Sequence, residues 1–342
     1  MIVWKGAKNV RYIWLAVISC LFFAAFPLNA LGAETLDQKQ ADEQRLLLYK
    51  KTAAVTNVPW HVLAAADQYE RNVRRSRRDL SKQEGLIGIY IPAPLWAGPL
   101  NPLQEDTNPA RIDFFGGIGK DGNGDGVASK TDDEDLLYTF AHVLGKYGSD
   151  MDNIKIGLWN FYHRDKTVGI IVGHHKIFKK YGHIHLTEHA FPVPLRSNYS
   201  YRSTWGDARG WGGRRIHEGT DIFANYGVPV RSTAYGVVEM KGWNRFGGWR
   251  VGIRDLNNTY HYYAHLNGFA DGLHPGQIVE PGQLIGSVGS SGYGPPGTSG
   301  KFPPHLHYGM YKDNGRTEWS FDPHPHLRLW ERAERQKNRK KK

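Results

Sequence analysis

The pattern of the sequence changes abruptly at residues 191–194, which read Phe-Pro-Val-Pro, and this change constrains the fold more than any other feature. Before it, between residues 40 and 189, apolar residues recur at helical spacing. After it come short runs of β-branched and aromatic residues separated by Gly, Pro and Asn, which is typical of antiparallel strands. At 342 residues the chain is long enough for two domains. We therefore expect a multidomain α+β protein, with a helical domain over residues 34–191 and a mainly antiparallel β domain over residues 195–330.

Individual elements can be located within both parts. The expected helices are residues 58–72, with Pro59 at the start, residues 132–147, with acidic residues in the first turn and Gly148 at the end, and residues 165–181. A loop rich in Pro and Gly, residues 91–109, separates the first two. The expected strands are residues 228–231, 237–241, 249–254, 260–265 and 284–288.

The first residues have the layout of an export signal. Three basic residues among the first eleven precede an apolar run over residues 12–28, and small residues follow. The run is short for a membrane span of about 20 residues, yet it lacks a sharp cleavage site. A cleaved signal peptide and a retained signal anchor therefore both stay open for residues 1–33. Either alternative predicts an extracytoplasmic protein, secreted or held at the membrane.

Cysteine usage restricts the chemistry. Cys20 is the one cysteine of the sequence, and it lies inside the apolar run. The chain beyond it therefore has no disulfide, no thiol nucleophile and no thiolate ligand. A metal ion would have to be held by His, Asp or Glu.

The net charge of +11 is partly concentrated in a basic tail, residues 331–342. A basic tail favours a polyanionic partner. Because the chain carries an export signal, we expect anionic cell-wall polymers or lipid headgroups and no nucleic acid. A disordered, solvated tail without a specific partner is the alternative.

Two histidine clusters in the β part suit a metal ion. The first reads His-Glu-Gly-Thr-Asp over residues 217–221, and the second reads His-Leu-His over residues 305–307. Because alternate residues of a strand share one face, His305 and His307 would emerge together about 7 Å apart. Two imidazoles and one carboxylate leave the fourth tetrahedral position of zinc open, as in catalytic sites. Zinc would lower the pKa of a bound water to about 7 and polarise a carbonyl, so amide hydrolysis is the expected chemistry.

The order and separation of these segments resemble those of the lysostaphin/LytM-type zinc endopeptidases, which are peptidoglycan hydrolases. A Tyr-Ala-His-Leu segment at residues 263–266 lies between the two clusters, and paired Pro-Gly-Gln phrases follow at residues 275–279 and 281–286. The resemblance covers residues 214–323. The longer Gly- and Pro-rich loop at residues 290–304 looks closest to the LytH-type endopeptidases of spore-forming bacteria, which cut between L-Ala and D-Glu of the stem peptide.

The resemblance implies a role for five side chains. His217, Asp221 and His307 would bind zinc, while His265 and His305 would flank the zinc-bound water as general base and as stabilisers of the oxyanion. Peptidoglycan is the implied substrate.

His261 lies four residues before His265 and would share its face in an extended strand. It is expected to be a structural or substrate-edge histidine.

The helical part offers a possible calcium loop. Oxygen-bearing side chains fall at the positions of such a loop, with Gly126 at its sharp turn; the candidate ligands are Asp121, Asn123, Asp125 and Asp132. The final Asp replaces the usual bidentate Glu, which would weaken calcium binding. A plain turn that caps the next helix is the alternative.

The same part resembles the lysozyme-like fold of lytic transglycosylases, with Glu70 at the position of the acid. Arg71 and Gly88 depart from that family's pattern. A surface Glu70 paired with Arg74 one turn later is therefore the favoured interpretation, and nearby arginine would keep the carboxylate ionised.

The sequence is consistent with three hypotheses for the function of the chain. The leading hypothesis is a zinc endopeptidase acting on peptidoglycan, and the alternative is a catalytically inactive peptidoglycan-binding scaffold or regulator. All five site residues are present, which favours the enzyme. A glycan-cleaving helical part, which depends on Glu70, is the third.

Overall fold

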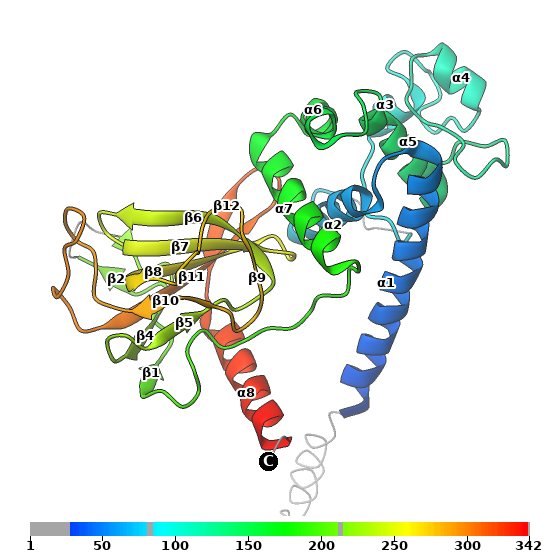
Figure 1. Cartoon of the computed structure of the whole chain (residues 1–342). Coiled ribbons are helices and arrows are strands. Elements are labelled where there is room, and N and C mark those ends of the chain that lie inside the picture. Colours follow the sequence, from blue (N-terminus) through cyan, green and yellow to red (C-terminus); the bar gives the residue numbers. More distant parts are fainter. Residues whose placement is uncertain (1–27, 81–84, 211–214, 341–342) are drawn as a thin grey trace, which may run out of the picture. The chain divides into compact units, whose positions relative to one another are not determined.

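The computed structural model describes residues 28–80, 85–210 and 215–340 (Figure 1). The expected export signal therefore lies almost entirely outside the described residues. Within these ranges no helix is both long and apolar enough to span a membrane. The chain forms two compact units, residues 1–43 and 44–342, which divide inside helix α1 (Leu28–Thr56).

The second unit begins with the helical part that the sequence predicts. After α1 come α2 (Trp60–Ser76), α3 (Ala93–Ala97), α4 (Pro109–Phe114), α5 (Asp133–Gly145), α6 (Met151–Tyr162) and α7 (Asp165–Tyr181). The carboxylates of Asp132 and Asp150 accept backbone N–H groups at the starts of α5 and α6. Gly182, with φ +73°, ends α7. The starts of α5 and α6 and the end of α7 therefore follow ordinary capping rules, and the end of α7 matches the expected range.

The β part is a large antiparallel sheet. Its central order is β1 (Tyr199–Tyr201), β4 (Thr220–Ala224), β11 (His305–Asp313), β8 (Thr259–Phe269), β7 (Gly248–Asp255), β6 (Gly236–Asn244) and β9 (Ile278–Val279). Three further strands extend it: β5 (Pro229–Arg231), β10 (Leu284–Val288) and β12 (Glu318–Phe321). Strands β2 (Ala208–Arg209) and β3 (Arg215–Ile216) form a separate pair. All five expected strands are present, which confirms the antiparallel β fold.

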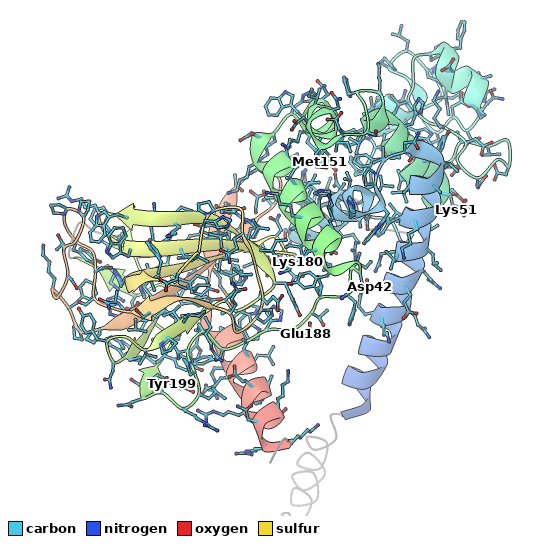
Figure 2. The ribbon with its side chains drawn as sticks, in the orientation of Figure 1. Asp42, Lys51, Met151, Lys180, Glu188 and Tyr199 are labelled. Atoms are coloured by element: carbon cyan, nitrogen blue, oxygen red, sulfur yellow. The ribbon has the colours of Figure 1, made fainter. Side chains whose placement is uncertain are left out.

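The helical part and the sheet pack against each other within this unit. Helix α7 contacts α2, β6 and β7, and side chains fill the space between them (Figure 2). The last residue of β11, Asp313, is fully buried and accepts two hydrogen bonds from the guanidinium of Arg164, at 3.0 and 2.6 Å. The helical part therefore anchors the end of the strand that begins with His305 and His307.

The structure of the basic tail differs from the disordered segment that was one alternative in the sequence analysis. Residues His324–Lys340 form helix α8, with Leu327 and Trp330 buried in the core of the sheet. The carboxylate of Glu331 accepts hydrogen bonds from the hydroxyls of Tyr199 and Tyr201, at 2.5 and 2.6 Å. A disordered tail is therefore wrong for this segment, because two apolar residues one turn apart give the helix a face to bury.

Candidate active site

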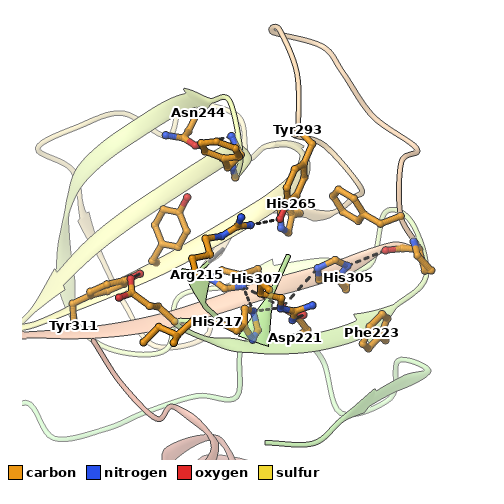
Figure 3. A pocket seen from close by; sticks show the side chains of 18 residues that line it. Arg215, His217, Asp221, Phe223, Asn244, His265, Tyr293, His305, His307 and Tyr311 are labelled. Carbon is orange, nitrogen blue, oxygen red and sulfur yellow. Dashed lines mark hydrogen bonds and ion pairs between the residues drawn. The ribbon is translucent and has the colours of Figure 1, made fainter. Parts of the chain in front are cut away.

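Strand pairing brings the two predicted metal-binding segments together. In the register of β4 and β11, Asp221 lies directly opposite His307. His217 precedes β4 by three residues and points its ring at the same place (Figure 3). Gly219 permits the close approach, since a Cβ there would lie 2.6 Å from the ring of His307. Position 219 is therefore a glycine because a larger side chain would collide with His307.

Three ligand atoms converge on one point. The distances are 3.0 Å from His217 Nε2 to Asp221 Oδ1, 3.1 Å from His307 Nδ1 to Asp221 Oδ1, and 2.9 Å between the two nitrogens. These separations approach the roughly 3.3 Å edge of a tetrahedron with zinc bond lengths. In the described part of the chain, no other group of three His, Cys, Asp or Glu residues has metal-binding geometry.

Hydrogen bonds fix the ring of His217 for this role. Its Nδ1 lies 2.8 Å from the backbone carbonyl oxygen of Thr204. Because a carbonyl oxygen only accepts, Nδ1 carries the proton and Nε2 presents its lone pair to the cluster. Two nitrogen atoms and one carboxylate oxygen are a donor set that zinc accepts. The residues present therefore fit a zinc ion with one open position.

The second oxygen of Asp221 has a partner that sequence reasoning missed. The guanidinium of Arg209 donates to Asp221 Oδ2 at 2.6 Å. Burial opposes the charge of Asp221, but the facing rings of His217 and His307 outweigh it and hold the pKa of this carboxyl well below its usual range. Arg209 lies in the two-residue strand β2, and no spacing rule ties it to the histidine segments.

His265 and His305 lie side by side next to the cluster. Their ring centroids are 4.9 Å apart, and His305 Nε2 is 3.7 Å from Asp221 Oδ1. His265 Nδ1 donates to the carbonyl oxygen of Ser291 at 2.8 Å, and His305 Nδ1 donates to that of Pro303 at 2.9 Å. Burial lowers the pKa of both rings, and for His265 the neighbouring His305 adds to the effect. Both rings are therefore neutral near pH 7, with free Nε2 lone pairs.

The predicted relation between His261 and His265 is wrong. His265 has φ +62°, and the ladders of β8 shift register beside it. This irregularity turns its ring to the face occupied by His307, whereas His261 points to the opposite face and bonds Asp255 and the Tyr308 hydroxyl. Regular alternation fails because a left-handed residue interrupts the strand.

A pocket of about 360 Å³ opens over these residues (Figure 3). The loop at residues 290–304 forms one wall. Phe302 packs against His265 and His305 with centroid distances of 4.7 and 5.1 Å, and Tyr293 stacks on His265 at 6.1 Å. The long loop that distinguishes this sequence therefore shapes the site.

The four candidate calcium ligands lie in the helical part, and their contacts do not support a calcium site. Asp121 accepts the N–H groups of Gly124 and Gly126, Asn123 accepts that of Asp125, and Asp132 caps α5. The geometry is that of turns and a helix cap, which was the alternative.

The interpretation of Glu70 requires a correction. Its side chain is 7% exposed, so it is not a surface residue. Burial raises its pKa to about 7, and this effect exceeds the lowering by the Tyr162 hydroxyl and Arg74. The sequence shows that Arg74 is close to Glu70, but it does not show how deeply Glu70 is buried.

Comparisons with known proteins agree with these motifs. Residues 215–323 match the model of peptidase family M23. Over 325 residues the chain is 67% identical to the L-Ala–D-Glu endopeptidase of Bacillus subtilis, which covers 95% of this chain and 99% of that protein. Over 115 residues it is 31% identical to lysostaphin of Staphylococcus staphylolyticus, covering 33% and 22% of the two chains.

Among solved structures, a zinc-containing peptidase of Vibrio cholerae is 25% identical, with a TM-score of 0.33 and coverage of 40% of this chain and 39% of that one. The near-complete match to the Bacillus protein decides the classification. This chain belongs to peptidase family M23, the zinc-dependent endopeptidases that its three histidine segments resemble.

Proposed function

We propose that this protein hydrolyses the amide bond between L-Ala and D-Glu in the stem peptides of peptidoglycan, outside the cytoplasmic membrane. The observation that carries the proposal is the convergence of His217 Nε2, Asp221 Oδ1 and His307 Nδ1 beside two neutral imidazoles. An inactive scaffold would have no need for this complete set.

The side chains supply distinct parts of the reaction. His217, Asp221 and His307 would hold zinc, which supplies a Lewis acid for the scissile carbonyl and activates water. The pair His265 and His305 would accept the proton of the attacking water through a free Nε2. The N–H formed in this way can donate a hydrogen bond to the oxyanion before the proton passes to the leaving nitrogen. The backbone carbonyls on their Nδ1 atoms keep both lone pairs directed into the pocket.

The choice of bond is supported by identity and by charge. The relative that is 67% identical over nearly the whole of both chains carries the name L-Ala–D-Glu endopeptidase. A glutamate linked through its nitrogen and one carboxyl group keeps its other carboxylate free beside the scissile bond. Arg215 lines the pocket, held by the Tyr293 hydroxyl at 2.5 Å and by the ring of Phe246, and its guanidinium suits that carboxylate.

The helical part is proposed to position the peptidase on its substrate. Glu70 has the raised pKa that a glycan-cleaving acid needs, but its side chain is almost enclosed. Such burial keeps a substrate oxygen away from the carboxyl group, and general acid catalysis requires hydrogen-bond contact. We therefore expect peptide fragments and no anhydro-sugars among the products.

Helix α8 is proposed to contact anionic wall polymers or lipid headgroups. Four arginines recur at residues 328, 332, 335 and 339, a spacing that puts them on one face of the helix. Arg335 pairs with Glu331 at 2.8 Å. Because Leu327 and Trp330 are buried in the protein, this helix offers charge and not an apolar face for insertion.

The proposal is tested by incubating the full chain with purified peptidoglycan and measuring released amines. We expect hydrolysis that a chelator abolishes and added zinc restores. Asp221→Ala should lose both zinc and hydrolysis, whereas Asp271→Ala, at an exposed turn, should retain both. Normal zinc content and normal hydrolysis in Asp221→Ala would refute the site.

A further inference from the structure

A second cavity, of about 530 Å³, lies on the opposite face of the sheet from the zinc site. Strands β8 and β11 contribute to both. On β11, His307 lines the zinc pocket, while Met310 and Lys312 line the second cavity. On β8, Tyr262 lines the zinc pocket and His261 lines the second cavity. Because side chains alternate along a strand, the two cavities are separate sites on one support.

The charged groups of this cavity are mainly cationic. Arg75 lies in the last turn of α2, Arg78 follows the helix by two residues, and Lys312 comes from the end of β11. The described lining includes one carboxylate, that of Asp255, which is 3% exposed. Its oxygens are already used, since His261 lies 3.1 Å from Oδ2 and two backbone N–H groups donate to Oδ1. The cavity therefore presents positive charge.

Lys312 stands where the strand pattern places core residues. Leu306, Tyr308 and Met310, on the same face of β11, are at most 2% exposed. Across the described residues, no carboxylate lies within 4.0 Å of the Lys312 ammonium group. Burial lowers the pKa of Lys312; Asp255 opposes this shift, and Arg75 makes a smaller contribution that lowers the pKa. A partly desolvated cation beside a second cation gains from a bound anion.

Imidazole and indole rings complete the wall. The ring of His189 stacks on Trp330 at 5.0 Å, and the ring of His326 lies 5.7 Å from it. Both histidines line the cavity and provide hydrogen-bonding nitrogens. Trp319 is 40% exposed and offers a flat surface for an organic group.

We propose that this cavity binds a small organic oxyanion, a carboxylate or phosphate carried on an organic group, with Lys312 and Arg78 as its charged contacts. The volume lies within the range of about 300–1,000 Å³ for ligand pockets, so a bare inorganic ion would leave most of it empty. The half-exposed ring of Trp319 packs the organic part. This site is independent of the peptidase activity.

Calorimetric titration of the full chain tests the proposal with two ligands, glycerol 3-phosphate and N-acetyl-D-glutamate. At least one should saturate a single site, with an affinity that falls as salt rises. Lys312→Met should weaken binding at least tenfold, while Lys155→Met, at an exposed surface lysine, should not change it. Tighter binding of glycerol 3-phosphate would indicate a phosphate as the natural ligand group, and tighter binding of N-acetyl-D-glutamate would indicate a carboxylate.

Asp221→Ala separates this cavity from the zinc site, and it should bind as the wild type does. Saturable binding by neither ligand, wild-type affinity in Lys312→Met, or loss of binding in Asp221→Ala would each overturn the proposal. Should Lys312→Met fail to fold, Arg78→Gln decides the question, because this side chain is exposed and its replacement leaves the core intact. Unchanged affinity in Arg78→Gln would then count against the site.

Discussion

His261 and His265 stand four residues apart on one strand, yet their rings face opposite sides of the sheet. The positive φ of His265 and the register shifts beside it cause the reversal. Its backbone N–H donates to the carbonyl oxygen of Gly247 at 2.8 Å, which holds the irregular position. A non-glycine residue in this conformation is strained, and such strain is found at functional sites.

The first prediction separates the metal ligands from the proton-transfer pair. His265→Ala should retain zinc and lose about two to four orders of magnitude in turnover, the usual contribution of a positioned acid or base. His307→Ala should lose zinc, because Nδ1 of His307 is one of the three proposed ligand atoms. Metal analysis and peptidase rates on both variants check this. Equal loss of zinc would make His265 a ligand.

A second prediction concerns Arg209, which acts on Asp221 and does not reach the metal position. Arg209→Gln removes the charged donor from Oδ2, so the carboxylate is held less firmly. We expect zinc affinity to fall about 10–100-fold, with turnover largely recovered at saturating zinc. Arg202→Gln, an exposed arginine 3.6 Å from Asp207, is the matched control. Unchanged zinc affinity in Arg209→Gln would remove this positioning role.

That His305 and His307 share one face could be predicted from the sequence, because strand geometry is regular there. The choice of His217, Asp221 and His307 as zinc ligands came from the resemblance to the lysostaphin/LytM-type endopeptidases and stays a prediction. His305 and His307 are two residues apart on β11, and pairing with β4 delivers Asp221 opposite His307. The helical and β parts could also be located from the sequence, because the spacing of apolar residues and the capping residues are local signals.

What the sequence could not provide depends on the folded environment. Arg209 meets Asp221 only in the folded chain, because β2 and β4 belong to different sheets, and His265 departs from strand alternation because its own backbone is left-handed. The burial that raises the pKa of Glu70 comes from helices distant in sequence. Such features follow from tertiary contacts and not from spacing.

A third prediction tests recognition of the acidic residue. Arg215→Gln should raise KM about 10–100-fold for a peptide with a free glutamate carboxylate, since a charged hydrogen bond is worth about 1.5–3 kcal/mol. A peptide with that carboxylate amidated should be cut at similar rates by both forms. Arg245→Gln, an exposed arginine 5.9 Å from the ring of Phe246, serves as control. Equal KM changes on both peptides would exclude carboxylate recognition.

The fourth prediction uses the pKa of Glu70. Its folded value of about 7 exceeds the ordinary 4.5, so the native state binds the proton more tightly and the wild type loses stability as pH rises between these values. Glu70→Gln removes this loss. Relative to wild type, its free energy of unfolding should increase by about 3 kcal/mol between pH 4 and pH 8.

Denaturant unfolding at several pH values measures that difference. Parallel profiles would show that Glu70 titrates normally. The variant should also keep its peptidase rate. Anhydro-muramyl products that appear with Asp221→Ala and vanish on adding Glu70→Gln would instead make the helical part a glycan-cleaving enzyme.

The identity of the cleaved bond is the most direct test of the proposed peptidase activity. Purified peptidoglycan fragments are incubated with the full chain and zinc, and the products are sequenced by mass spectrometry. The proposed function predicts new peptides that begin with D-Glu, and glycan chains that keep a single L-Ala. Products cut at any other bond, or intact stem peptides after complete zinc loading, would contradict it.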